Sequence, residues 1–215
     1  MKKINDFLQH TRQQYDQGIL HENHLDEDPI KQFEIWMHEA IAAGVPEPNA
    51  MDLCTVSNSK PSSRIVLLKG VDERGFIFYT NYESKKGQDL FLNPAACLNF
   101  FWQLQARQVR VEGMIEKVSP EESDSYFASR PRESQIGAWA SSQSTVIRSR
   151  VELEEQITAL ELQYKDHVIP RPLHWGGYVV KPTRIEFWQG RPNRLHDRFV
   201  YDIGENETMV FRLSP

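Results

Sequence analysis

The chain of 215 residues has little cysteine and no long apolar run. Its two cysteines, Cys54 and Cys97, lie in apolar stretches, which predicts reduced thiols in a core and excludes a disulfide-stapled scaffold. No apolar stretch approaches the roughly 20 residues that a membrane-spanning helix needs. The first residues become charged before any apolar run typical of a signal peptide. We therefore expect a cytoplasmic protein that does not bind membranes.

An excess of positive charge is also absent, because the net charge is −5. The chain as a whole is therefore a poor match to nucleic acid, and its arginine clusters act as local fields. Glycine-rich phosphate loops, a G-x-S-x-G elbow and a C-x-x-C pair are missing too. His21 and His24 have the spacing of metal ligands, but they lie in a polar linker without cysteine or a further close histidine. We expect no metal site.

What is present predicts strands that meander, with helices at intervals. Asp28-Pro29 is a typical helix start, and a helical apolar pattern follows to Gly44. Ser84 and Ser119-Pro120 predict two more helix starts, and the spacing over 151–165 predicts a late helix. Strands are expected over 51–56, 64–69, 75–80, 97–102, 108–118, 178–188, 195–201 and 209–213. The pattern predicts a mainly β fold with peripheral α-helices, an antiparallel barrel.

The segment RLHDRF (194–199) is the most informative part of the chain. Read as a strand, it places Arg194, His196 and Arg198 on one face. Two guanidiniums and an imidazole repel one another unless an anion lies among them. The segment follows the aromatic-rich strand IEFWQG (185–190), so a flat phosphorylated ligand is one interpretation. A solvated strand face, with Asp197 pairing a neighbouring arginine, is the other.

Three further groups suit an anionic ligand. Lys85 and Lys86 follow Ser84 at a helix N-terminus, where a bound anion offsets the helix dipole. Tyr126, Arg130 and Ser134 are spaced by four, but Pro131 interrupts a helix, so a turn has to bring them together. For Lys69 and Gln108, each taken alone, an exposed strand position is the default interpretation. The segment 129–139 is unusually dense in groups that bind phosphate.

Five segments together resemble the pyridoxamine 5′-phosphate oxidase family. They are RIVLLK (64–69), FYTN (78–81), SRPRESQIGAW (129–139), FWQG (187–190) and RLHDRF (194–199). The resemblance covers residues 28–215 in the family's order. It implies an FMN-binding split β-barrel and a homodimer with the flavin at the subunit interface. It also implies oxidation of pyridoxamine 5′-phosphate and pyridoxine 5′-phosphate to pyridoxal 5′-phosphate, with O2 as acceptor giving H2O2.

The resemblance also implies roles for individual residues. The flavin set would be Arg64, Ile65, Val66, Leu67, Leu68, Lys69, Tyr79, Thr80, Lys85, Lys86, Gln108, Gln143, Ser144, Trp188 and Arg198. The substrate set would be Lys69, Tyr126, Arg130 and Ser134 around the phosphate, with Arg194 and His196 as the catalytic pair over the pyridine ring. The polar segment 1–27 would be a lid that closes over the substrate with Arg12 and Tyr15, and residues 28–215 would form the oxidase domain.

Two other functions remain open at this level. One is another split-barrel flavoprotein, such as a reductase with a different substrate, although a substrate without phosphate needs neither Arg130 nor Arg194. The other is a carrier that binds flavin or pyridoxal phosphate without catalysis. Nucleic-acid binding is disfavoured by the acidic charge and by arginines that form short separate clusters.

Overall fold

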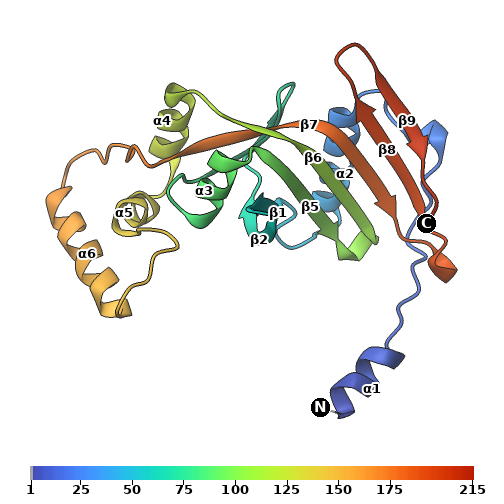
Figure 1. Cartoon of the computed structure of the whole chain (residues 1–215), viewed down its shortest axis with the longest axis horizontal. Helices are drawn as coiled ribbons and strands as arrows, with labels where there is room; N and C mark the ends of the chain where they lie inside the picture. The colour runs from blue at the N-terminus through green and yellow to red at the C-terminus, as the bar shows by residue number, and fades with distance from the viewer. Residues whose placement is uncertain (1) are drawn as a thin grey trace. The chain divides into compact units, whose positions relative to one another are not determined.

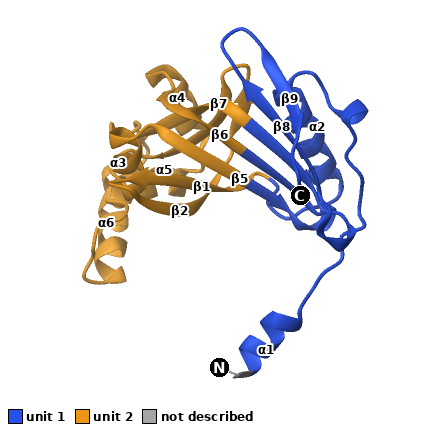
Figure 2. Ribbon diagram, turned by 45° about the vertical axis from the view of Figure 1, so that its right-hand side comes forward, with its two compact units in different colours: residues 1–48, 100–110, 185–215 blue, residues 49–99, 111–184 orange. Residues whose placement is uncertain are grey.

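The computed structural model describes residues 2–215 and divides them into two units. Unit 1 contains residues 1–48, 100–110 and 185–215, and unit 2 contains residues 49–99 and 111–184 (Figure 2). Three strands contribute residues to both units: β5 (Ala95–Trp102), β6 (Arg107–Lys117) and β7 (Trp175–Gln189).

Unit 2 begins with a tight hairpin. Strands β1 (Ala50–Ser57) and β2 (Lys60–Leu67) pair antiparallel around Asn58 and Ser59, which both have positive φ. Two positive φ angles in a two-residue turn match the right-handed twist of the strands. Strands β3 (Gly70–Asp72) and β4 (Gly75–Asn81) follow, and β4 pairs antiparallel with β7. The hydrogen-bonded order is β2-β1-β5-β6-β7-β4-β3 (Figure 1). The prediction of a mainly antiparallel β fold with helices is confirmed.

Two helices of unit 2 begin at the residues that the sequence predicted. Ser84 caps α3 (Lys85–Leu92), and Ser119 caps α4 (Pro120–Ser129), each by accepting a backbone N–H. Helix α4 ends before Pro131, and α5 (Arg132–Ala140) starts after it, so a turn does interrupt the helix. Helix α6 (Arg150–Gln163) begins at a third serine cap, Ser149. Phe127, Ile136, Ile169 and Trp175 form an apolar cluster in this unit.

Unit 1 packs α2 (Pro29–Ala42) against aromatic strand residues. Asp28 caps the helix as predicted, and the ring of Phe33 lies 5.0 Å from that of Phe100. Trp36 meets Phe187 edge-on at 5.2 Å. The remaining elements of this unit are α1 (Lys2–His10), η1 (Glu22–His24), η2 (Gln103–Gln105), η3 (Pro192–Arg194), β8 (Asp197–Ile203) and β9 (Thr208–Arg212).

Several sequence expectations are wrong. Residues 194–196 are not on a strand, because β8 starts at Asp197 and Arg194 ends the 3-10 turn η3 with φ of 63°. Pro192 and the positive φ of Asn193 turn the chain before the strand can start. Strand β3 has no counterpart in the prediction. Cys54 and Cys97 lie opposite each other on β1 and β5, and each is half-buried instead of lying in the core.

No helix within residues 2–215 is long and apolar enough to cross a membrane. In the same range, no group of three or more histidine, cysteine, aspartate or glutamate side chains is arranged to hold a metal ion.

Candidate functional site

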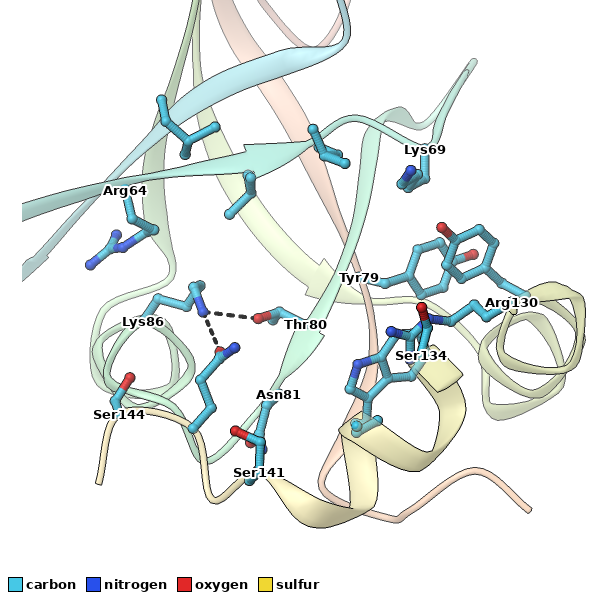
Figure 3. Close-up of a pocket in the computed structure, with 18 of the residues that line it drawn as sticks. Arg64, Lys69, Tyr79, Thr80, Asn81, Lys86, Arg130, Ser134, Ser141 and Ser144 are labelled. Carbon is cyan, nitrogen blue, oxygen red and sulfur yellow. Dashed lines mark hydrogen bonds between the residues drawn. The ribbon is translucent and has the colours of Figure 1, made fainter. Parts of the chain in front are cut away.

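Unit 2 contains a cavity of about 1040 Å³. Its walls come from β2, β4, α3, the α4–α5 turn and the loop after α5 (Figure 3). Fourteen residues named from the sequence line it: Arg64, Ile65, Val66, Leu67, Lys69, Tyr79, Thr80, Lys85, Lys86, Tyr126, Arg130, Ser134, Gln143 and Ser144. Leu68 does not, because it is buried beneath the end of β2. The cavity brings together distant segments of the chain, from Ser62 to Trp175.

One end of the cavity, which we call the basic corner, consists of Arg64, Lys85 and Lys86. Lys86 Nζ donates to Thr80 Oγ1 at 3.1 Å, Ser84 Oγ at 3.2 Å and Gln143 Oε1 at 2.6 Å (Figure 3). These acceptors are all neutral. Burial, and to a smaller extent the charge of Arg64, lowers the pKa of Lys86 to about 8. The ammonium therefore lies in a site that disfavours its charge unless an anion is present.

A single carboxylate, Asp89, partly offsets the basic corner. It accepts hydrogen bonds from Thr55 Oγ1 at 2.9 Å and Lys85 Nζ at 2.8 Å, and Arg64 Nη2 lies 3.8 Å away. Arg64 also donates to the carbonyl of Leu53 and to Thr55 Oγ1, both at 2.9 Å. Three cations facing one carboxylate leave an excess of two positive charges, which matches the charge of a phosphate monoester near neutral pH.

The other end, which we call the aromatic corner, consists of Tyr79, Tyr126, Trp175, Arg130 and Ser134. The rings of Tyr79 and Tyr126 stack with centroids 3.8 Å apart, and Trp175 lies nearly parallel to both. Burial raises the pKa of Tyr79 to about 12, so its hydroxyl stays protonated at neutral pH. Figure 3 shows Arg130 and Ser134 beside this stack, away from Arg64 and Lys86.

Arg130 is the exceptional cation of the cavity. Its Nη1 is buried and has no hydrogen-bond partner among residues 2–215, and no described carboxylate pairs with it. Its guanidinium lies over the ring of Trp175, with Cζ 4.6 Å from the ring centroid. Burial lowers the pKa of Arg130 from its usual value, although an arginine stays charged. A desolvated guanidinium in the wall of the cavity, with one nitrogen lacking a hydrogen-bond partner, suits a phosphate oxygen.

Unit 1 holds the second group of predicted residues. His196 lies 4.6 Å from the ring of Trp188 and 6.0 Å from that of Tyr15. The backbone N–H of Arg191 donates to His196 Nδ1 at 3.0 Å. Because a backbone N–H can only donate, the neutral ring carries its proton on Nε2. Burial of the ring, followed by the charge of Arg194, lowers the pKa of His196 below its ordinary value.

The arginines around His196 are mostly neutralised within unit 1. Asp197 accepts from Arg191 Nη1 at 3.2 Å and from Arg212 Nη1 at 2.9 Å, and also from the backbone N–H of Leu20. Arg198 Nε pairs with Glu186 at 2.7 Å. Asp197 therefore does pair neighbouring arginines, as the alternative interpretation of this segment predicted.

The other predicted residues of unit 1 are less constrained. Arg194 and Arg12 are exposed, and Gln108 is half-buried on β6. Tyr15 packs edge-on against Trp188 at 5.7 Å, and a Cβ at Gly190 would come within 2.7 Å of its ring. The segment before η1 is thus held in place at Tyr15 and not at Arg12.

Sequence reasoning missed Trp175 and Asp89, which complete the two corners. Trp175 directly precedes Gly176-Gly177, and an aromatic residue before two adjacent glycines was a signal of close packing. Asp89 lies one helical turn after Lys85, a spacing that predicts an ion pair on α3.

Comparisons with known proteins identify the family of the chain. Residues 37–164 match the model of the family described as pyridoxamine 5′-phosphate oxidase. Residues 175–215 match the model described as the pyridoxine 5′-phosphate oxidase C-terminal dimerisation region. The chain is similar to the pyridoxine/pyridoxamine 5′-phosphate oxidase of Synechocystis, with 54% identity over 97% of this chain and 98% of the relative. It is 55% identical to that of Salinibacter ruber over the full length of both.

Solved structures show the same fold. PhzG from Burkholderia lata, crystallised with tetrahydrophenazine-1-carboxylic acid, has a TM-score of 0.86 at 28% identity and covers 92% of this chain. A pyridoxamine 5′-phosphate oxidase-related, FMN-binding protein of Nostoc punctiforme has a TM-score of 0.71 at 14% identity over 89% of this chain, which is a likeness of fold alone. The family model covers more than half of the chain and full-length relatives exceed half identity, so this chain belongs to the pyridoxamine 5′-phosphate oxidase family.

Proposed function

We propose that this chain oxidises pyridoxamine 5′-phosphate and pyridoxine 5′-phosphate to pyridoxal 5′-phosphate. The observation that carries the proposal is that one cavity contains two separate groups of cations and hydroxyls, each suited to a phosphate. Lys86 is bonded only to neutral acceptors, and Arg130 has an unbonded N–H group. A reaction between a phosphorylated cofactor and a phosphorylated substrate needs two such sites.

The basic corner suits the phosphate of FMN. Its excess of positive charge, the hydroxyl of Thr80 and the N–H groups at the start of α3 are the donors a phosphate prefers. No side chain of the cavity accepts a hydride, so bound FMN would supply the electron-accepting chemistry, with O2 reoxidising it and H2O2 released. Relatives are named as oxidases of these substrates, which supports this assignment.

The aromatic corner suits the substrate phosphate. Arg130 provides the charge, and the hydroxyls of Tyr126 and Ser134 line the same part of the cavity. Lys69, at the rim, adds a second cation. Their part in the reaction is to bind and orient the substrate, which is how a protein promotes a cofactor's chemistry.

His196 and Arg194 are proposed to contact the substrate ring. The neutral imidazole offers an Nε2–H donor, since Arg191 occupies Nδ1. The exposed Arg194 is free of the carboxylates that neutralise Arg191 and Arg212, so its charge is available to an anionic ring substituent. Trp188, Arg198 and Gln108 are proposed to contact the flavin, and Arg12 and Tyr15 to form the lid within residues 1–27.

The match of residues 175–215 to a dimerisation region supports a homodimer. We propose that the flavin binds at the interface between two copies. Flavin retention should then depend on protein concentration, because a ligand that binds only the dimer is linked to its formation.

A visible spectrum tests the proposed function. Purified protein with FMN should lose its flavin absorbance on anaerobic addition of pyridoxamine 5′-phosphate and regain it in air. A flavin spectrum that ignores the substrate would favour a reductase or a carrier. Protein that binds no added FMN would exclude the proposal.

A further inference from the structure

Trp175 lines the cavity as part of the aromatic corner, but its side chain is not one of the groups proposed to contact the phosphate. It is the first residue of β7 and is 7% exposed. Its ring lies nearly parallel to those of Tyr79, at 5.6 Å, and Tyr126, at 6.2 Å. The three rings are therefore nearly parallel to one another, and all three line the cavity.

The strand register explains how this stack forms. Asn81 and Trp175 are paired across β4 and β7, and Tyr79 is paired with Gly177. Residues two apart on a strand share a face, so Tyr79 and Trp175 lie diagonally on one face of the sheet. A Cβ at Gly177 would come within 2.7 Å of the Tyr79 ring. The missing side chain lets Tyr79 lie flat beside Trp175.

The backbone of Trp175 is held from outside the stack. Arg171 Nη1 donates to the Trp175 carbonyl at 2.7 Å, and Arg171 Nε pairs with Asp124 at 2.6 Å. The Trp175 N–H donates to the carbonyl of Pro172 at 3.0 Å. These bonds connect the backbone of Trp175, through Arg171 and Asp124, to α4.

The guanidinium of Arg130 lies over the indole ring of Trp175. This guanidinium has no carboxylate partner within residues 2–215, and its nearest aromatic face is that of Trp175, at 4.6 Å, while Phe127 is at 5.6 Å. A contact between a guanidinium and the face of a ring does not use the N–H groups at the edge of the guanidinium, so these groups can still bind an oxyanion. An ion pair would instead have occupied them.

We propose that Trp175 is a positioning residue for the substrate phosphate, acting through Arg130. The indole holds the guanidinium flat and desolvated without consuming its donors. This inference rests on the proposed function, because it takes the phosphate of pyridoxamine 5′-phosphate as the anion at Arg130.

A purely structural role predicts a different result. Trp175 also belongs to the apolar cluster with Phe127 and Ile136, so its removal lowers stability in any case. A loss of packing alone would reduce active protein and would affect phosphorylated and unphosphorylated substrates alike. A positioning role affects only the binding of the phosphate.

The experiment compares Trp175→Leu, which removes the aromatic face, with Trp175→Phe, which keeps one. The holoenzyme is assayed with pyridoxamine 5′-phosphate and with unphosphorylated pyridoxamine, and its affinity for pyridoxal 5′-phosphate is measured by calorimetry. From the range of cation–π energies, we expect KM for the phosphorylated substrate to rise about tenfold in Trp175→Leu and roughly twofold in Trp175→Phe. The value of kcat should change by less than about twofold, because Trp175 is proposed to act on the phosphate of the substrate and not on its reacting carbon. The dissociation constant of pyridoxal 5′-phosphate should rise in parallel with KM.

Equal losses with both substrates, or an unchanged dissociation constant in a folded Trp175→Leu variant, would overturn the inference. If Trp175→Leu does not fold, the same measurements are made on Trp175→Phe and Trp175→Tyr. An unchanged dissociation constant of pyridoxal 5′-phosphate in both variants would also overturn the inference. Wild-type protein that binds pyridoxal 5′-phosphate but oxidises neither substrate would exclude the proposed function, while the calorimetry would still decide the role of Trp175.

Discussion

The cations in the cavity of unit 2 differ in their partners from those around His196 in unit 1, which we call the histidine region. Around His196, the arginines Arg191 and Arg212 share Asp197, and Arg198 pairs with Glu186. In the cavity, Lys86 and Arg130 have no carboxylate partner among the described residues. Paired arginines fix the path of the chain, whereas unpaired, desolvated cations are available to bind an anion. This difference supports our proposal that the cavity binds phosphate, although the arginine-rich segment 194–199 was the more conspicuous one in the sequence.

Removing the charge of Arg130 should have the largest effect. Arg130→Met should lower kcat/KM for pyridoxamine 5′-phosphate roughly 100-fold, since charge-assisted hydrogen bonds to a phosphate are lost. Steady-state assays of the holoenzyme measure it. Arg150→Met is the matched control, because Arg150 is an exposed arginine on α6 that pairs only with Glu154. A comparable loss in the control, or none in Arg130→Met, would contradict the assignment.

Closing the space at Gly177 should disturb the cavity and leave the histidine region intact. In Gly177→Ala the added Cβ would lie 2.6 Å from Val118 Cγ2 and 2.7 Å from Tyr79 Cε1. We expect the free energy of unfolding to fall by about 1–3 kcal/mol, as in other overpacked sites. Denaturant unfolding measures the change. Gly137→Ala on α5 meets no atom within 4 Å and should be neutral or stabilising, by up to about 1 kcal/mol. Equal stability of the two variants would contradict the close approach of Tyr79.

The affinity for FMN should depend on pH through Lys86. Because burial lowers the pKa of Lys86 to about 8, the ammonium is charged below that pH and loses its proton above it. The dissociation constant of FMN should therefore rise as the pH increases beyond 8, by at most about tenfold per pH unit for one proton. Flavin fluorescence titrations measure it. Lys86→Met should bind FMN weakly, and its affinity should not depend on pH in this range. Lys165→Met, which changes an exposed lysine, should keep the pH dependence of the wild type.

The proton position on His196 should produce the smallest effect. His196→Gln places an amide N–H near the position of Nε2, whereas His196→Asn is too short to do so. We expect His196→Gln to retain about fivefold more activity than His196→Asn, the value of roughly one hydrogen bond. In the wild type, activity should fall only below the ordinary pKa of histidine, because the pKa of His196 is lowered and protonation places a second N–H against that of Arg191. A pH profile with its acid limb above 6.5 would contradict this protonation state.

The sequence by itself determined the local elements and the family. Ser84, Ser119 and Asp28 cap helices because each side chain accepts an N–H two or three residues ahead, within reach of any chain that starts a helix there. The turn at Pro131 is equally local, because the ring of proline and its missing backbone N–H prevent α4 from continuing through that position. Most residues expected to bind phosphate also line the cavity, and their types follow from the chemistry of the proposed ligand.

The tertiary structure decided which cations remain unpaired. Whether Arg130 meets a carboxylate or the ring of Trp175 depends on the register of β4 with β7 and on the packing of α4, which no neighbouring residue specifies. The same holds for Asp197, whose partners Leu20 and Arg212 come from distant parts of the chain. Capping and turn preferences act over a few residues, but pairing and desolvation depend on contacts between remote segments, so they exist only in the folded chain.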